Sequence, residues 1–136
     1  MRSSNVEKTK VRIGKQRKNS MNDSSLRWVF LGGRPLGVAC LDALKNAGYL
    51  PTLIITGPDR PTGRGQVLTP PPEKEWGDTH GIEVLQPEKL KTIEEELAAR
   101  GPWDVFALAS YGQILSKRFL SIPTKGVVNM HPSLLL

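Results

Sequence analysis

The chain has 136 residues, of which 38% are hydrophobic and 24% are charged, enough for one modest domain with its own core. Its single cysteine, Cys40, excludes an intrachain disulfide and favours a reducing compartment. No apolar run approaches the roughly 18 residues that a membrane-spanning helix needs, so a membrane protein is not expected.

Residues 1–25 carry few apolar side chains and no sustained period, which is typical of a disordered tail. Residues 1–20 hold seven basic side chains against one acid, Glu7, and so account for the whole formal net charge of +6. The rest of the chain is neutral, so overall charge gives the domain no general affinity for polyanions. Three interpretations of the tail remain open: a plain disordered tail, a mis-called start with the true start at Met21, or a transit peptide.

From residue 26 the chain alternates apolar runs with helical patterns. Residues 28–31 predict a buried strand that ends in the Gly32-Gly33 turn. Residues 35–47 predict a helix that begins at Pro35 and stops before Gly48. Its apolar positions at helical spacing are Leu36, Ala39, Cys40, Ala43, Leu44 and Ala47.

Later elements follow the same alternation. Residues 50–56 predict a second buried strand, whereas residues 57–72, with five prolines and three glycines, show no period and are predicted to be an irregular loop. Further elements are predicted as a helix at 73–80, a short strand at 84–85, a surface helix at 88–100 with Leu90, Ile93 and Leu97 inward, a strand at 104–109, a brief helix at 116–121 and a strand at 126–130. This order indicates an α/β protein with a Rossmann-like, doubly wound, mostly parallel sheet, which binds ligands beyond the carboxyl ends of its strands.

Two glycine-containing segments invite comparison with phosphate-binding loops. Gly32-Gly33 lacks the full dinucleotide pattern, and the lone acid Asp59 adds little, so we interpret it as a structural turn. In residues 58–65, prolines and glycines shape the backbone while Arg60 and Arg64 offer planar forks for phosphate. A solvated loop and a nucleic-acid contact both remain open for this segment.

The last strand ends in the most specific pattern, Asn129-Met130-His131-Pro132-Ser133. Alternate residues of a strand share one face, so Asn129 and His131 are expected to point the same way. An amide donor beside an imidazole can stabilise an oxyanion and move a proton. An isolated pair of this kind is more often structural, so the interpretation depends on context.

A family resemblance supplies that context. Residues 129–135 resemble the N-x-H-x-S-L-L-P signature of formyltransferases that use 10-formyltetrahydrofolate, and residues 111–115 (Tyr-Gly-Gln-Ile-Leu) resemble their folate-facing segment. Residues 58–65 resemble the insertion of the methionyl-tRNA formyltransferase family, which reaches toward the acceptor end of initiator tRNA. The resemblance covers about residues 26–136, in the family's order. It departs in the first turn, Gly-Gly-Arg-Pro against Gly-Thr-Pro, and at Leu136, where the family has proline.

The resemblance implies a role for each matching position. Asn129 and His131 would be catalytic, with a later aspartate of the family as their third partner. Arg64, with Arg60, would contact initiator methionyl-tRNA, and no metal is expected. The residues expected to bind the formyl donor 10-formyltetrahydrofolate are Gly112, Gln113, Ile114, Leu115, Ser133, Leu134, Leu135 and Leu136.

Several expectations concern the protein as a whole. Residues 26–136 are interpreted as the N-terminal part of a catalytic domain, without the third catalytic residue or the C-terminal tRNA-binding barrel. A truncation, gene fragment or frameshifted product is therefore expected, inactive by itself. The full-length form is expected to be a monomer in the bacterial cytoplasm, or in a mitochondrial matrix or plastid if the tail is a transit peptide.

Two alternative functions stay open. The signature also fits formyltransferases that act on glycinamide ribonucleotide or on a nucleotide-sugar amine, although residues 58–65 argue against them. A non-catalytic remnant that binds folate or RNA belongs to a different class, and binding without turnover is its expected behaviour.

Overall fold

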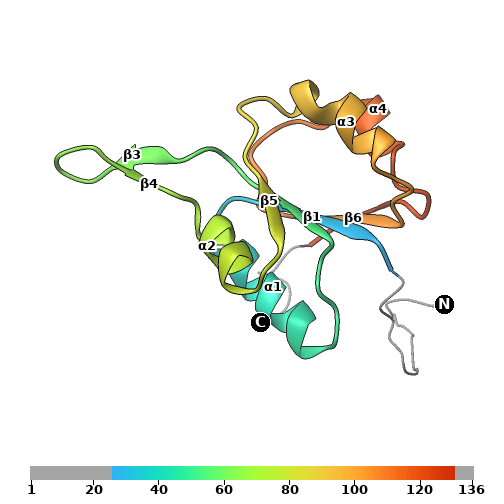
Figure 1. The fold of residues 1–136 in the computed structure, drawn as a ribbon, viewed down its shortest axis with the longest axis horizontal. Helices are drawn as coiled ribbons and strands as arrows, with labels where there is room; N and C mark the ends of the chain where they lie inside the picture. The colour runs from blue at the N-terminus through green and yellow to red at the C-terminus, as the bar shows by residue number, and fades with distance from the viewer. Residues whose placement is uncertain (1–25, 131–136) are drawn as a thin grey trace. The chain divides into compact units, whose positions relative to one another are not determined.

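A computed structural model describes residues 26–130, and the chain divides into two compact units. Of the described residues, one unit comprises residue 26 and residues 43–50, and the other comprises residues 27–42 and 51–130. The second unit contains the strands that the structure describes, so the candidate site is built within it (Figure 1). The predicted tail, residues 1–25, lies outside the described residues.

The main sheet of the second unit has five parallel strands in the order β5-β2-β1-β6-β7. From the central β1, the chain moves outward to β2 and β5, then crosses to the other side of β1 for β6 and β7. The order therefore reverses between β1 and β6, which confirms the predicted doubly wound sheet. The strands are β1 Trp28–Gly32, β2 Leu53–Ile55, β5 Glu83–Leu85, β6 Val105–Ala109 and β7 Val127–Asn129.

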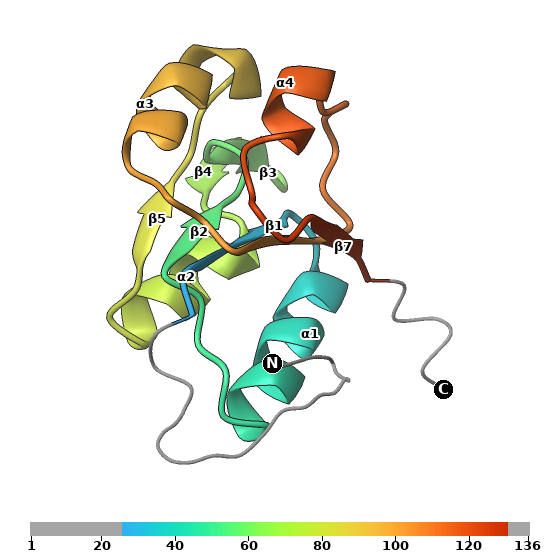
Figure 2. The same cartoon turned by 90° about the vertical axis from the view of Figure 1, so that its right-hand side faces the viewer.

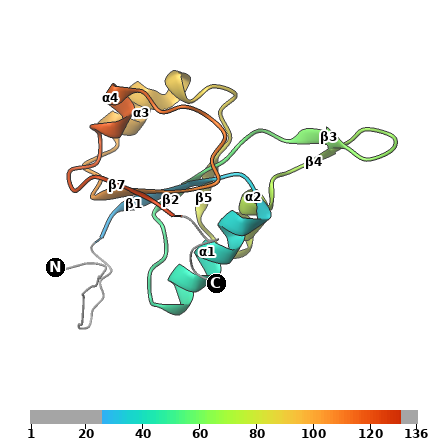
Figure 3. The same cartoon turned by 180° about the vertical axis from the view of Figure 1, so that it is seen from behind.

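Helices cover both faces of this sheet (Figures 2 and 3). One face carries residues 35–42 of α1 (Pro35–Asn46) together with α2 (Pro72–Thr79). The other face carries α3 (Glu94–Ala99), preceded by the 3-10 turn η1 (Leu90–Ile93), and α4 (Lys117–Leu120). The helix predicted at 88–100 is thus shorter than expected and begins as a 3-10 turn.

Alternate strand residues face opposite layers, so each face of the sheet packs its own core. Phe30 and Ile54 are fully buried on the α1/α2 side, where the backbone of α2 comes close to Ile54 at Gly77. Leu90 and Leu97 are inward as predicted, at 3% and 0% exposed. The cluster on the α3/α4 side consists of Val29, Leu31, Leu53, Ile55, Leu90, Leu97, Trp103, Phe106 and Phe119.

The predicted inward face of α1 was only partly right. Cys40 is buried, but Leu36 is 52% exposed and Ala39 is exposed. The buried positions are Gly37, Cys40 and Leu41. A Cβ at Gly37 would collide with the carboxylate of Glu73, so the helix can pack this closely only with the glycine facing inward. The buried face of α1 is therefore rotated relative to the face that hydrophobic spacing predicts.

The described part of the first unit includes the end of α1. Gly48, at φ +97°, donates its N–H to Lys45 O at 2.9 Å, and Tyr49 N–H donates to Leu44 O at 2.8 Å. These two bonds form a Schellman motif, in which a glycine in the left-handed region ends the helix. The predicted stop before Gly48 is therefore confirmed.

Residues 57–72 were wrongly predicted to be irregular, because they contain an antiparallel hairpin. β3 (Arg60–Thr62) pairs with β4 (Val67–Thr69), and the hydroxyls of Thr62 and Thr69 hydrogen-bond across the pair. Strands of three residues with a proline and without alternating burial leave no period to detect. We call residues 60–69 the arm; all of them are exposed, and they extend away from the sheet (Figures 1 and 3).

Candidate functional site

Four segments of the second unit meet at one edge of the sheet, because the carboxyl ends of parallel strands lie together. The arm follows β2, the Gly32-Gly33 turn follows β1, residues 110–115 follow β6, and Asn129 ends β7. The reversal of strand order between β1 and β6 is where doubly wound sheets bind their ligands. This edge is therefore the candidate site.

Asn129 lies beside Leu108, near the end of β6 and three residues before the 111–115 segment. In the β6–β7 ladder it pairs with Leu108, and Met130 N–H donates to Leu108 O at 2.7 Å. Its side chain is exposed rather than packed in the core, so the amide is accessible. The fold thus brings Asn129 to the edge where the predicted folate segment begins.

The other residues of the signature are not placed. His131, Ser133, Leu134, Leu135 and Leu136 lie outside the described residues. The expectation that Asn129 and His131 share a face therefore stays a prediction.

The backbone turns sharply at Ser110, directly after β6. Ser110 has φ +60°, a left-handed conformation that is uncommon for a residue other than glycine. Such residues collect at functional sites, where the surrounding structure holds them in place. Next to it, the Tyr111 side chain packs against the α3/α4-side core, and burial raises the pKa of its hydroxyl to about 12.

Residues 112–115 divide into anchored and free side chains. Gln113 donates its amide to Glu88 O at 3.1 Å and accepts from Leu90 N–H at 2.9 Å, so its side chain fixes the loop before η1. Leu115 packs against the core. Ile114 is 97% exposed, and Gly112 has no neighbour where a Cβ would be. The face left open to a ligand is therefore apolar and uncrowded.

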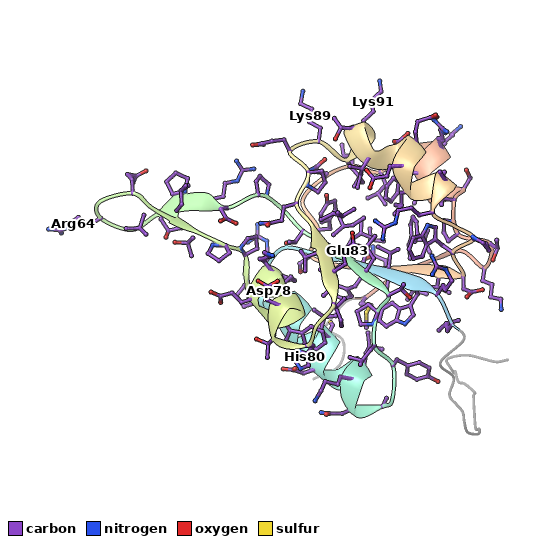
Figure 4. The ribbon with its side chains drawn as sticks, in the orientation of Figure 1. Arg64, Asp78, His80, Glu83, Lys89 and Lys91 are labelled. Atoms are coloured by element: carbon purple, nitrogen blue, oxygen red, sulfur yellow. The ribbon has the colours of Figure 1, made fainter. Side chains whose placement is uncertain are left out.

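The arm carries both candidate RNA-binding arginines. Arg64 is at its tip, between Gly63 and Gly65, which adopt φ +68° and +91°. Figure 4 shows the Arg64 side chain pointing away from the rest of the unit. Arg60, at the base, lies 4.0 Å from the Glu88 carboxylate, and both side chains are mostly exposed, so this pair contributes little.

One ionisable residue at this edge was missed by the sequence analysis: Glu73, which is 0% exposed. Its Oε2 accepts a 3.0 Å hydrogen bond from the N–H of Arg34, the residue before α1. A Cβ on Gly32 would lie 3.1 Å from that oxygen and 2.9 Å from Ala109 O. The Glu73 carboxylate therefore lies close to the carboxyl ends of β1 and β6. It fits there because Gly32 and Gly37 have no side chains to occupy the same space.

Burial raises the pKa of Glu73 to about 6, despite the opposing hydrogen bonds from the N–H groups of Glu73 itself and Arg34. Its Oε1 has no hydrogen-bond partner within the described part of the chain. The sequence hinted at a buried side chain here only through the glycines in and after the first turn, Gly32 and Gly37. We interpreted the first turn as structural and did not recognise that its glycines leave space for a side chain.

Two further absences concern residues 26–130 only. No group of three His, Cys, Asp or Glu side chains there could hold a metal ion. No helix among them is long and apolar enough to cross a membrane.

Comparison with known proteins agrees with this geometry. A family model described as "Formyl transferase" matches residues 26–135, so the chain belongs to the formyl transferase family. Among its relatives, it is 49% identical over 112 residues to the methionyl-tRNA formyltransferase of Chloroflexus aggregans and 45% identical over 112 residues to that of Anaeromyxobacter dehalogenans. The corresponding protein of Halorhodospira halophila is 47% identical over 110 residues.

The matched region is a minor part of these relatives. It takes up 81% of this chain but 36% of the Chloroflexus and Anaeromyxobacter proteins, and 80% against 35% for Halorhodospira. The chain thus spans about a third of the length of the relatives that it matches.

Proposed function

We propose that this chain supplies the formyl-donor pocket and the RNA-contacting arm of a methionyl-tRNA formyltransferase, acting in translation initiation. The observation that carries the proposal is the arrangement of one sheet edge. An arginine-bearing arm, an exposed apolar segment and an accessible asparagine leave the sheet at the carboxyl ends of β2, β6 and β7. The relatives named above support the choice of substrate.

In this reaction a formyl group passes from 10-formyltetrahydrofolate to the amino group of methionine on initiator tRNA. The C–N bond to the new amine forms, and the bond to the folate nitrogen breaks. The Asn129 amide would donate a hydrogen bond to the formyl oxygen as negative charge develops there. His131, with an aspartate that the family carries further along its chain, would take the proton that the amine loses and deliver a proton to the departing folate nitrogen.

Residues 112–115 fit the donor. Ile114 offers an apolar face, and Gly112 leaves room for a flat ring system to approach the backbone. The buried hydroxyl of Tyr111 has no partner within the described residues and is available to a polar atom of a ligand or to water. Ser133 to Leu136 would complete this pocket.

Arg64 is our candidate for the contact with the acceptor end of the tRNA. A guanidinium can bind phosphate or base edges bidentately, and at the arm's tip nothing in the described chain competes for it. Arg60 would contribute charge near the base of the arm. A small amine such as glycinamide ribonucleotide or a nucleotide sugar would have no use for a contact this far from the sheet edge.

We also propose where the longer protein acts. It would work as a monomer in a bacterial cytoplasm, or in a mitochondrial matrix or plastid if residues 1–25 are a transit peptide. By itself the 136-residue chain should bind without turning over, since it spans about a third of its relatives.

Two substitutions separate the pocket from the arm. Arg64→Ala should weaken binding of an acceptor-stem RNA by about 1–3 kcal/mol and leave binding of a folate analogue unchanged. Ile114→Ser should weaken binding of the folate analogue and leave binding of the RNA unchanged, because it removes apolar surface from the donor pocket only. Fluorescence titration of the 136-residue chain with each ligand measures both.

The binding outcomes distinguish the two classes of amine substrate. Arg64-dependent RNA binding together with folate binding supports the proposal, whereas folate binding without RNA binding favours a small-amine substrate. Formyl transfer by the isolated chain would overturn the expected inactivity. If neither ligand binds, the proposed function is wrong.

A further inference from the structure

The arm has almost no support of its own from the rest of its unit. Residues 60–69 are all exposed, and within the described chain their hydrogen bonds are internal. The ion pair from Arg60 to Glu88 is long and solvated. The direction of the arm must therefore be set at its two roots, where it joins β2 and α2.

The outgoing root is stiff because of its covalent structure. It runs through Pro70, Pro71 and Pro72, whose rings fix φ, and Pro72 is the first residue of α2. Glu73 follows at once and is fully buried, with its Oε2 bound to Arg34 N–H. The prolines and the buried Glu73 therefore fix the outgoing root without further side-chain contacts.

The incoming root, residues 57–59, is different, because Gly57 has the widest conformational freedom of any residue. The side chain of Gln86, the residue that follows β5, holds this root in place. The Nε2 of Gln86 donates to Gly57 O at 3.1 Å and to Asp59 Oδ1 at 2.8 Å. Both N–H donors of the amide are thus used on the two residues that flank Pro58.

We propose that Gln86 is a positioning residue that sets the direction of the arm and thereby aligns Arg64 on the acceptor end of the RNA. This inference rests on the proposed function of the arm. Its physical basis is that a short root bound at two points cannot rotate about Gly57 without breaking both bonds. Asp59, which the sequence analysis considered only as weak support for a dinucleotide site, belongs to the incoming root and accepts one of the two hydrogen bonds from Gln86.

The direct test measures the direction of the arm without RNA. Spin labels at Val67→Cys in the arm and Lys125→Cys in the loop before β7 report the distance between them, while the native Cys40 is buried and stays unlabelled. The parent protein should give one narrow distance distribution. Gln86→Leu, of similar size but without hydrogen bonds, should broaden it.

Two further variants keep this test independent of folding. Asp59→Ala removes only the side-chain acceptor of the incoming root and should also broaden the distribution. Thr92→Val is the matched control, because it deletes one side-chain bond, to Lys89 O at 2.7 Å, from the segment that follows Gln86 without touching the arm. It should leave the distribution narrow.

Binding of an acceptor-stem RNA then links the clamp to recognition. Gln86→Leu should weaken it roughly three- to ten-fold, the loss expected when a side chain must be ordered on binding, and Thr92→Val should not. An unchanged distance distribution in Gln86→Leu overturns the clamp. A broadened distribution with unchanged RNA affinity overturns its role in recognition. If Arg64→Ala has no effect on RNA, the proposed function fails, while the distance measurement still decides whether Gln86 holds the arm.

Discussion

At the scale of single residues, the buried carboxylate of Glu73 is the most consequential feature that sequence patterns did not show. In the stretch Pro71-Pro72-Glu73-Lys74, an acid near a helix start is expected to face water. Instead, Glu73 turns inward to the start of α1, where Gly37 has no side chain to exclude it. The acid and the glycine are far apart in sequence, so only the fold relates them.

Burial gives this residue a pH dependence of defined sign. Because the pKa of Glu73 rises from 4.5 to about 6 on folding, the folded chain binds more protons than the unfolded chain between these values. The resulting stability is present in full below pH 4.5 and is lost as the pH rises through about 6. The loss should be on the order of 1–2 kcal/mol.

Glu73→Gln tests this directly, since glutamine can still accept the Arg34 N–H bond but does not titrate. Urea unfolding at several pH values should show the parent protein losing stability relative to the variant as the pH rises from about 4.5 to about 6.5. A stability difference that stays constant across this range would falsify the assignment of the pKa.

At the scale of secondary-structure elements, sequence prediction succeeded where the apolar pattern follows burial directly. The central strands β1 and β2 are buried at every position and were found as continuous apolar runs, whereas the inward Leu90 and Leu97 were found by their helical spacing. It failed where hydrophobic spacing carries no information about the geometry. The face of α1 follows the close approach of Glu73 at Gly37, which is distant in sequence, and the arm is a local hairpin whose paired residues are all exposed. For the candidate site, the position of Asn129 at the strand end could be predicted, but the anchoring of Gln113 could not, because its partners are backbone atoms of another loop.

The packing of α2 depends on a glycine as well. A Cβ on Gly77 would collide with Val84 and lie 3.3 Å from both Ile54 Cδ1 and Ile82 O. Gly77→Ala should therefore destabilise the fold by about 1–2 kcal/mol, because overpacking outweighs the gain in helix propensity. Glu75→Ala, an exposed change in the same helix, should shift stability by less than about 0.5 kcal/mol. Thermal unfolding compares the two; if Gly77→Ala proved as stable as the parent, α2 would have to be free to shift away from β5.

At the scale of the second unit, the topology of the sheet explains why the segments of the candidate site lie together. Parallel strands and a reversal of order between β1 and β6 bring segments from residues 32 to 129 to a single edge. No local pattern specifies that meeting. The family's motifs therefore appear scattered in sequence, yet Asn129, Ile114 and the root of the arm all start from neighbouring strand ends.

The exposed arm is also the part of the described chain where we expect a protease to cut first. Brief trypsin treatment should cut first, among the described residues, at the Arg64–Gly65 bond, because Pro61 protects the bond after Arg60 and the hairpin tip is open to the protease. Mass spectrometry of the earliest products checks the position of the cut. A first cut within a helix of the sheet layers would contradict this expectation.

Such a cut should not release the two pieces from each other. The first piece contributes β1 and β2, and the second contributes β5, β6 and β7, so the strand order leaves the first piece flanked on both sides by ladders to the second. Gel filtration should recover the nicked protein as one species, and separately produced halves should reassemble. A backbone that interleaves in this way can be divided at its most exposed point and still retain a single hydrogen-bonded sheet.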